Sequence, residues 1–98
     1  MKTLCVAAVL MLAASAQADE ALARKLACTA CHAIDKKLLG PSFKQVAAKH
    51  MGQADAQAVL EDKIRKGGVG VWGAIAMPAQ PNLKDTDVKA LATWILAQ

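Results

Sequence analysis

The 98-residue sequence is poor in aromatic residues, with one Phe, two Trp and no Tyr. It contains only three cysteines, too few for a scaffold built from several disulfides. No stretch alternates as a β-strand would, and there are neither internal repeats nor low-complexity segments. A chain of this length is a single domain, whose core stabilises the fold by only about 3–5 kcal/mol. These shortages indicate that something besides an ordinary apolar core stabilises the protein.

Long apolar runs are also missing. The longest, at residues 4–14, is shorter than the roughly 20 residues that a membrane-spanning helix needs. It follows Lys2 and precedes the small residues of Ala-Gln-Ala at 16–18, a pattern typical of a secretory signal peptide. We therefore predict a cleaved signal peptide at residues 1–18 and one mature domain at residues 19–98. A retained membrane anchor is the alternative.

The strongest motif lies near the start of that domain. Cleavage removes Cys5 and leaves Cys28 and Cys31 in the run Cys-Thr-Ala-Cys-His, which ends at His32. Two thiols at this spacing can form thioethers with both vinyl groups of one haem, and the histidine that follows is an axial ligand of the iron. The sequence therefore predicts one covalently attached haem c. A large apolar cofactor would also supply the missing stabilisation.

A second axial ligand is expected in the glycine-rich loop that follows the third predicted helix. Met77 lies there, between Gly73 and Pro78, and a thioether opposite histidine raises the reduction potential of a haem. Methionine more often fills gaps in a core, so packing is the alternative role. Met51 is the rival ligand, and its neighbour His50 would give a bis-histidine haem. We predict that Met77 is the ligand.

Apolar residues recur at helical spacing throughout the domain, which predicts an all-α fold. One helix is expected to begin near Asp19, and another, ending near Lys49, to begin at a capping box of Ser42 and Gln45. Glycines at 67, 68, 70 and 73 predict an irregular loop. Two further helices are predicted, one at about 54–66 with the apolar stripe Ala56, Val59, Leu60 and Ile64, and one after Asp85 or Thr86 with the stripe Val88, Leu91, Ala92 and Ile95.

Four segments carry a resemblance to a known family: CTACHAID from residue 28, LGPSFKQVAAKH from 39, GVWGAIAMP from 70 and LATWILAQ from 91. They resemble the small bacterial class I c-type cytochromes of the cytochrome c-551 (c8) group. The resemblance implies four to five helices around one low-spin haem. It also implies a monomeric periplasmic electron carrier that is not an enzyme and binds no nucleic acid.

The resemblance implies roles for individual residues as well. Cys28 and Cys31 match the residues that bind haem covalently, and His32 and Met77 match the axial ligands. The list extends to Pro41, whose carbonyl would accept a hydrogen bond from the ligand histidine, and to Trp72, whose indole N–H would reach a haem propionate.

Two departures from the family pattern affect the surroundings of the haem. Lys63 stands where many members have an arginine near the propionates, and lysine lacks the planar fork of a guanidinium. The family often places an asparagine three residues after the ligand methionine, where it hydrogen-bonds the sulfur. Here Gln80 has that spacing and Asn82 has that chemistry, so both remain candidates.

Other functions fit the sequence less well. A zinc site usually takes four ligands, and the adjacent Cys31 and His32 suit a tetrahedron poorly. A haem enzyme or gas sensor needs an exchangeable sixth position and acid or base groups, which the loop around Met77 does not offer. We predict an electron carrier between a quinol–cytochrome c reductase type donor and a reductase, possibly nitrite reductase, with transient docking at an exposed haem edge. A positive rim of Lys36, Lys37, Lys44 and Lys49 is expected to assist docking, unless these lysines are only solvated charge.

Overall fold

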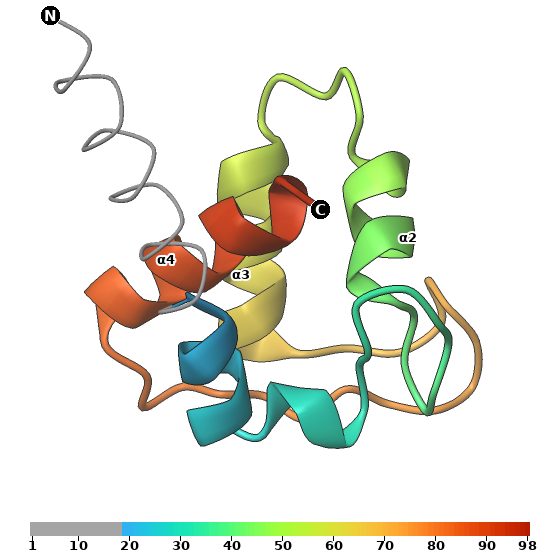
Figure 1. The fold of residues 1–98 in the computed structure, drawn as a ribbon, viewed down its shortest axis with the longest axis horizontal. Coiled ribbons are helices and arrows are strands. Elements are labelled where there is room, and N and C mark those ends of the chain that lie inside the picture. Colours follow the sequence, from blue (N-terminus) through green and yellow to red (C-terminus); the bar gives the residue numbers. More distant parts are fainter. Residues whose placement is uncertain (1–18) are drawn as a thin grey trace, which may run out of the picture.

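The computed structural model describes residues 19–98. The predicted signal peptide at 1–18 lies outside this range. The described chain forms a helical segment at 19–25, a short 3-10 turn η1 (Cys28–Ala30), and three α-helices, α2 (Phe43–Lys49), α3 (Ala56–Lys66) and α4 (Asp85–Leu96) (Figure 1). Within these residues the only β-type pairings are two isolated bridges, His32 with Lys37 and Gly68 with Met77. The all-α prediction is confirmed.

The core is organised around α4. Val88, Leu91 and Ala92 of this helix are at most 1% exposed, because their spacing places them on one face. That face packs on α2 and α3, and Ala23 of the first helical segment is buried in the same core. Figure 1 shows the 19–25 segment beside α4, and α2 and α3 as separate helices, each of which contacts α4. None of the helices in the described part of the chain is long and apolar enough to cross a membrane.

The start of α2 matches its sequence signal. The Ser42 hydroxyl accepts a hydrogen bond from the Gln45 N–H, and the Gln45 side-chain oxygen accepts one from the Ser42 N–H, which completes the predicted capping box. Ser42 is buried, so water cannot replace these bonds easily. The predicted helix end at Lys49 is also confirmed.

Three local expectations differ from the structure. The first helix does not run on into Cys28, because Ala27 adopts a left-handed conformation (φ 63°) that turns the chain before η1. α4 begins at Asp85, with Lys84 as its N-cap residue. Val59 of the predicted stripe on α3 is 36% exposed, whereas Leu60 and Ile64 are buried. The core-facing stripe of α3 is therefore narrower than the sequence suggested.

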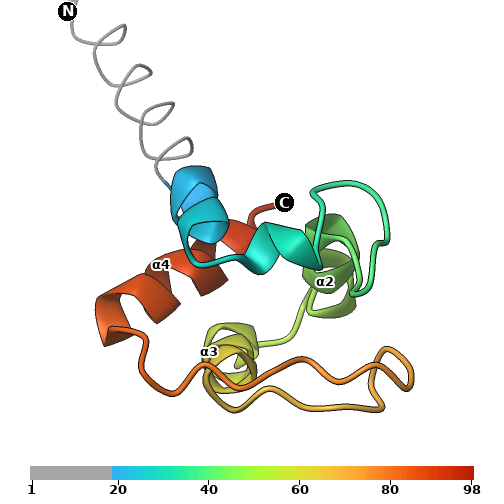
Figure 2. The same cartoon turned by 90° about the horizontal axis from the view of Figure 1, so that it is seen from below.

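The loop that follows α3 reaches far from the core. Figure 2 shows residues 67–80 as a long arm that leaves the end of α3, passes below α2 and returns toward α4. Its middle is exposed, and the apolar side chains of Val69, Val71 and Ile75 are 60%, 51% and 65% accessible. The middle of the arm therefore has little contact with the core.

Candidate functional site

The two cysteines of the motif lie on one tight turn. The Cys28 carbonyl accepts hydrogen bonds from the Cys31 N–H (3.2 Å) and the His32 N–H (3.0 Å), which brings the three functional residues together. Both thiols are free and half-buried. Burial raises the pKa of the Cys28 thiol above its ordinary value, with a smaller contribution from the neighbouring Cys31. The turn thus holds two free thiols and the His32 backbone close together.

The ring of His32 is held by the segment at 40–43. Its Nδ1 lies 2.7 Å from the carbonyl oxygen of Pro41. A carbonyl can only accept, so Nδ1 donates, and in the neutral ring Nε2 then keeps its lone pair for a metal. The Phe43 ring stacks on the imidazole with centroids 5.4 Å apart. The contact between His32 and Pro41 is the one expected from the family resemblance, and it orients the imidazole as an axial ligand requires.

Gly40 contributes to this arrangement in a way that the sequence reading missed. A Cβ added at Gly40 would lie 2.9 Å from Nδ1 of His32 and closer still to its Cε1. The ring therefore occupies the space that any other side chain would need. The only sequence signal was a glycine directly before Pro41, which reads equally well as an ordinary turn.

Met77 is held at the base of the loop by main-chain bonds. Its N–H donates to the carbonyl of Gly68 at 2.8 Å, and the Gly68 N–H donates to the carbonyl of Met77 at 3.1 Å. Met77 is half-buried, whereas the rival Met51 is 83% exposed. His50 ends α2, and its Nδ1 lies 2.7 Å from Oε1 of Gln53. Met51 thus lies in solvent, and the imidazole of His50 contacts the side chain of Gln53.

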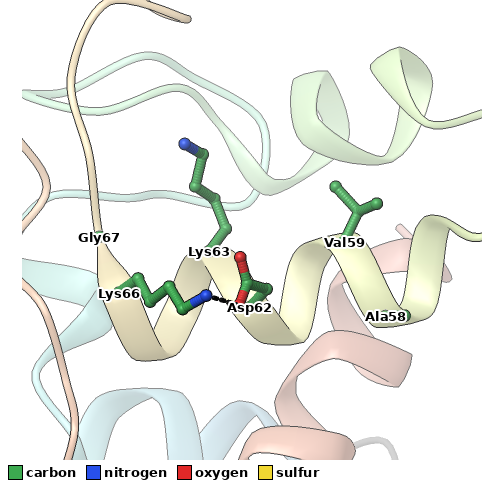
Figure 3. Close-up of a pocket in the computed structure, with 6 residues that line it drawn as sticks. All are labelled: Ala58, Val59, Asp62, Lys63, Lys66 and Gly67. Carbon is green, nitrogen blue, oxygen red and sulfur yellow. Dashed lines mark ion pairs between the residues drawn. The ribbon is translucent and has the colours of Figure 1, made fainter.

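A cavity of about 490 Å³ borders α3 and the start of the loop. Figure 3 shows Val59 and Lys63 extending from one side of the helix, while Lys66 turns away to pair with Asp62 at 2.9 Å. Gly67 lines the same cavity at the end of the helix. Val59 and Lys63 both line this hollow, which accounts for the exposure of Val59.

The remaining predicted residues lie around the loop. Lys63 reaches toward Gly68, since its Nζ would be 2.9 Å from a Cβ at that position. Trp72 is 44% exposed, and Nζ of Lys49 lies 5.3 Å from the centre of its ring. Gln80 is partly buried, and its N–H donates to the carbonyl of Arg65 at 2.9 Å, whereas Asn82 is exposed.

A second cavity, of about 330 Å³, opens beside His32 on the side of the aromatic core. It is lined by His32, Phe43 and Trp94, among others, and the rings of Phe43 and Trp94 meet edge to face at 5.0 Å. Aromatic and imidazole groups therefore form a continuous packed set from the motif to α4.

The donor set suits a haem better than a zinc ion. Within residues 19–98, no three side chains of His, Cys, Asp or Glu gather as a metal site. The structure instead offers two free thiols on one turn, an imidazole with Nε2 available, a partly buried thioether and a row of accessible apolar side chains. These are the groups that attach, ligate and surround a covalently bound haem.

Comparison with known proteins agrees with this geometry. The family model for cytochrome c matches residues 16–98. Cytochrome c-552 of Nitrosomonas europaea is 49% identical over 90 residues, covering 92% of this chain and 87% of that protein. Cytochrome c-551 of Allochromatium vinosum is 49% identical over 84 residues, covering 86% of this chain and 89% of that one. The crystal structure of the Nitrosomonas europaea cytochrome c552 matches with a TM-score of 0.77 and 47% identity, covering 80% of this chain and 96% of that chain.

Proposed function

The chain belongs to the cytochrome c family, and we propose that it carries single electrons through the periplasm on a haem ligated by His32 and Met77. It carries covalently bound haem c, has the all-α class I cytochrome c fold, and is an electron-transfer protein and not an enzyme. The observation that carries the proposed ligation is the hydrogen bond from Nδ1 of His32 to the Pro41 carbonyl, which leaves Nε2 free beside two thiols.

Each residue of the motif has a distinct task in this proposal. Cys28 and Cys31 hold the haem by thioether bonds and so prevent its loss. Pro41 and Phe43 keep the imidazole of His32 in one orientation, which limits rearrangement between oxidation states. The haem iron supplies the one-electron redox chemistry when bound.

Residues of the loop and of α3 complete the proposed site. Met77 is the second axial ligand, and its thioether favours the reduced state. Lys63 and Trp72 lie at the propionate side of the haem in this proposal, and for Lys63 this is supported by its position at the cavity beside α3. We assign the contact with the Met77 sulfur to Gln80, because Gln80 is partly buried and Asn82 is exposed.

The proposed partners are a quinol–cytochrome c reductase type donor and a periplasmic or terminal reductase. Export by the signal peptide at 1–18, a monomeric state and the lack of a membrane anchor after cleavage belong to the same proposal. Lys36, Lys37, Lys44 and Lys49 are all exposed, as a positive rim for acidic partners requires.

Replacement of each methionine tests the ligation. Met77→Ala is expected to abolish the weak far-red band of sulfur-to-iron charge transfer in the oxidised protein and to lower the reduction potential, because the thioether is lost. The vacated position is expected to bind cyanide, which absorption titration measures. Met51→Ala serves as the control, since its side chain is in solvent. Loss of the band in Met51→Ala but not in Met77→Ala would show the ligand assignment to be wrong.

A further inference from the structure

We propose that Gly67 is a positioning residue for Met77. Because it has no side chain, the end of α3 lies directly against the main chain of residues 77–79, and this contact determines where the methionine sulfur stands. The inference rests on the proposed role of Met77 as the axial ligand.

The first observation is the closure of the loop at its base. The reciprocal hydrogen bonds between Gly68 and Met77, at 2.8 and 3.1 Å, join the two ends of the segment 69–76. That segment is exposed at every residue. Its middle therefore gives Met77 little support, and the position of the ligand depends on the base.

The second observation is the lack of space at Gly67. A Cβ there would collide with the carbonyl oxygen of Met77 and would lie 2.8 Å from both the Pro78 carbonyl carbon and the Ala79 nitrogen. All three are main-chain atoms, so no side-chain rotation relieves the contact. Any side chain at residue 67 would push the segment 77–79 away from α3.

The third observation is that Gly67 belongs to a well-anchored part of the fold. Its N–H donates to the Lys63 carbonyl at 2.8 Å and closes the last turn of α3, whose Leu60 and Ile64 are buried in the core. Just beyond the contact, the Gln80 N–H donates to the Arg65 carbonyl at 2.9 Å. The chain that carries Met77 therefore contacts α3 on both sides of Pro78, through the close approach at Gly67 and the hydrogen bond from Gln80 to Arg65.

Two other glycines allow the effect of this contact to be distinguished from the effect of backbone strain alone. Gly67 has φ +65°, and Gly52 and Gly70 have φ +77° and +100°, values that L-residues rarely adopt. A Cβ added at Gly52 or at Gly70 would meet no atom within 4 Å. Alanine at any of the three positions is strained, but only alanine at residue 67 meets the chain of Met77.

The experiment compares Gly67→Ala with Gly52→Ala and Gly70→Ala in the haem-loaded protein. For Gly67→Ala we expect loss of most of the far-red band, a lower reduction potential and binding of imidazole at least about tenfold tighter, which corresponds to about 1.4 kcal/mol. The two control variants are expected to keep the band and the imidazole affinity of the unaltered protein. A Gly67→Ala spectrum and affinity equal to those of the controls would overturn the proposal.

Two further measurements keep the outcome interpretable. If Met77→Ala keeps the far-red band, the proposed ligation itself fails; if Met77→Ala loses it while Gly67→Ala matches the controls, only the positioning role fails. Should Gly67→Ala not accumulate, hydrogen exchange on the unaltered holoprotein decides. If the amides of Gly68 and Met77 exchange much more slowly than the amide of Gly73, the base of the loop is anchored as proposed. Equal exchange rates refute this anchoring.

Discussion

At the scale of the residue, small groups decide the geometry of His32, the proposed axial ligand. The Pro41 carbonyl fixes which nitrogen of His32 carries a proton, and Gly40 leaves room for the ring. Phe43 stacks on the imidazole and is only 2% exposed, so the ring plane is set by a side chain that cannot move freely. These neighbours come from one short stretch of chain, so the orientation of His32 depends on the start of α2.

The ring of Trp72 is also held by a neighbouring side chain, in this case through a cation–π contact. Nζ of Lys49 lies 5.3 Å from its ring centre, and a cation–π contact at an exposed site contributes about 0.5–1 kcal/mol. Lys49→Gln is therefore expected to lower the free energy of unfolding by about 0.5 kcal/mol and to shift the NMR resonance of the Trp72 indole N–H. Lys44→Gln, exposed on the same helix, is the control. Equal effects of the two substitutions would mean that the contact contributes nothing.

At the scale of the element, α2 links helix capping to the haem site. Its capping box joins Ser42 and Gln45, and the residue just before Ser42 is Pro41, whose carbonyl oxygen lies 2.7 Å from Nδ1 of His32. The carbonyl of Pro41 is therefore placed by the same turn that starts the helix. The base of the Met77 loop is likewise placed by the end of α3.

Removal of the cap should reduce stability. Ser42→Ala takes away the acceptor of the Gln45 N–H inside a buried site and is expected to lower the free energy of unfolding by about 1 kcal/mol. Guanidinium unfolding followed by circular dichroism measures this loss. Thr86→Ala, in the first turn of α4 but outside any cap, should change it by much less. Gln45→Ala removes the other bond of the box, from the Ser42 N–H to Gln45 Oε1, so the double substitution is expected to cost more than either single change. A double variant as stable as one of the single variants would contradict the box.

At the scale of the whole molecule, the lysines are distributed unevenly around the haem motif. Lys36 and Lys37 lie on the exposed turn at 35–39. Both views place this turn and the first turn of α4 at opposite ends of the molecule (Figures 1 and 2). A carrier that must release its partner after each transfer benefits from charges that raise the encounter rate without raising affinity.

Electron transfer to an acidic partner should therefore slow as salt is added, because surface charges are screened within about 8 Å at physiological ionic strength. Replacing Lys36 and Lys37 together by Gln is expected to reduce both the rate and its salt dependence, with the visible spectrum unchanged. Stopped-flow oxidation across a salt series measures both. Lys84, the N-cap residue of α4, and Lys89, within α4, are both exposed and form a control pair of equal charge. Equal effects of the two pairs would assign docking to net charge, and no effect of either would assign it to the apolar rim of the haem.

The sequence alone was enough to identify the family, the cofactor and the fold class. The spacing of Cys28, Cys31 and His32 matches the chemistry of one haem, and capping and helical periodicity predicted α2, α3 and α4 to within about two residues. These features depend on residues close together in the chain, so they can be read locally. The roles of His32 and Met77 as ligands stay predictions that the structure makes geometrically reasonable.

Only the tertiary structure decided how distant residues meet. Periodicity placed Val59 on the apolar stripe of α3, yet it borders a cavity, because the width of a buried face depends on what packs against it. The glycines at 40 and 67 looked like ordinary turn residues. Both glycines matter because of what the fold packs against them, which is the ring of His32 at Gly40 and the backbone of Met77–Ala79 at Gly67. A glycine is required there because another segment fills the space of its missing side chain, and that segment is determined by packing across the whole domain.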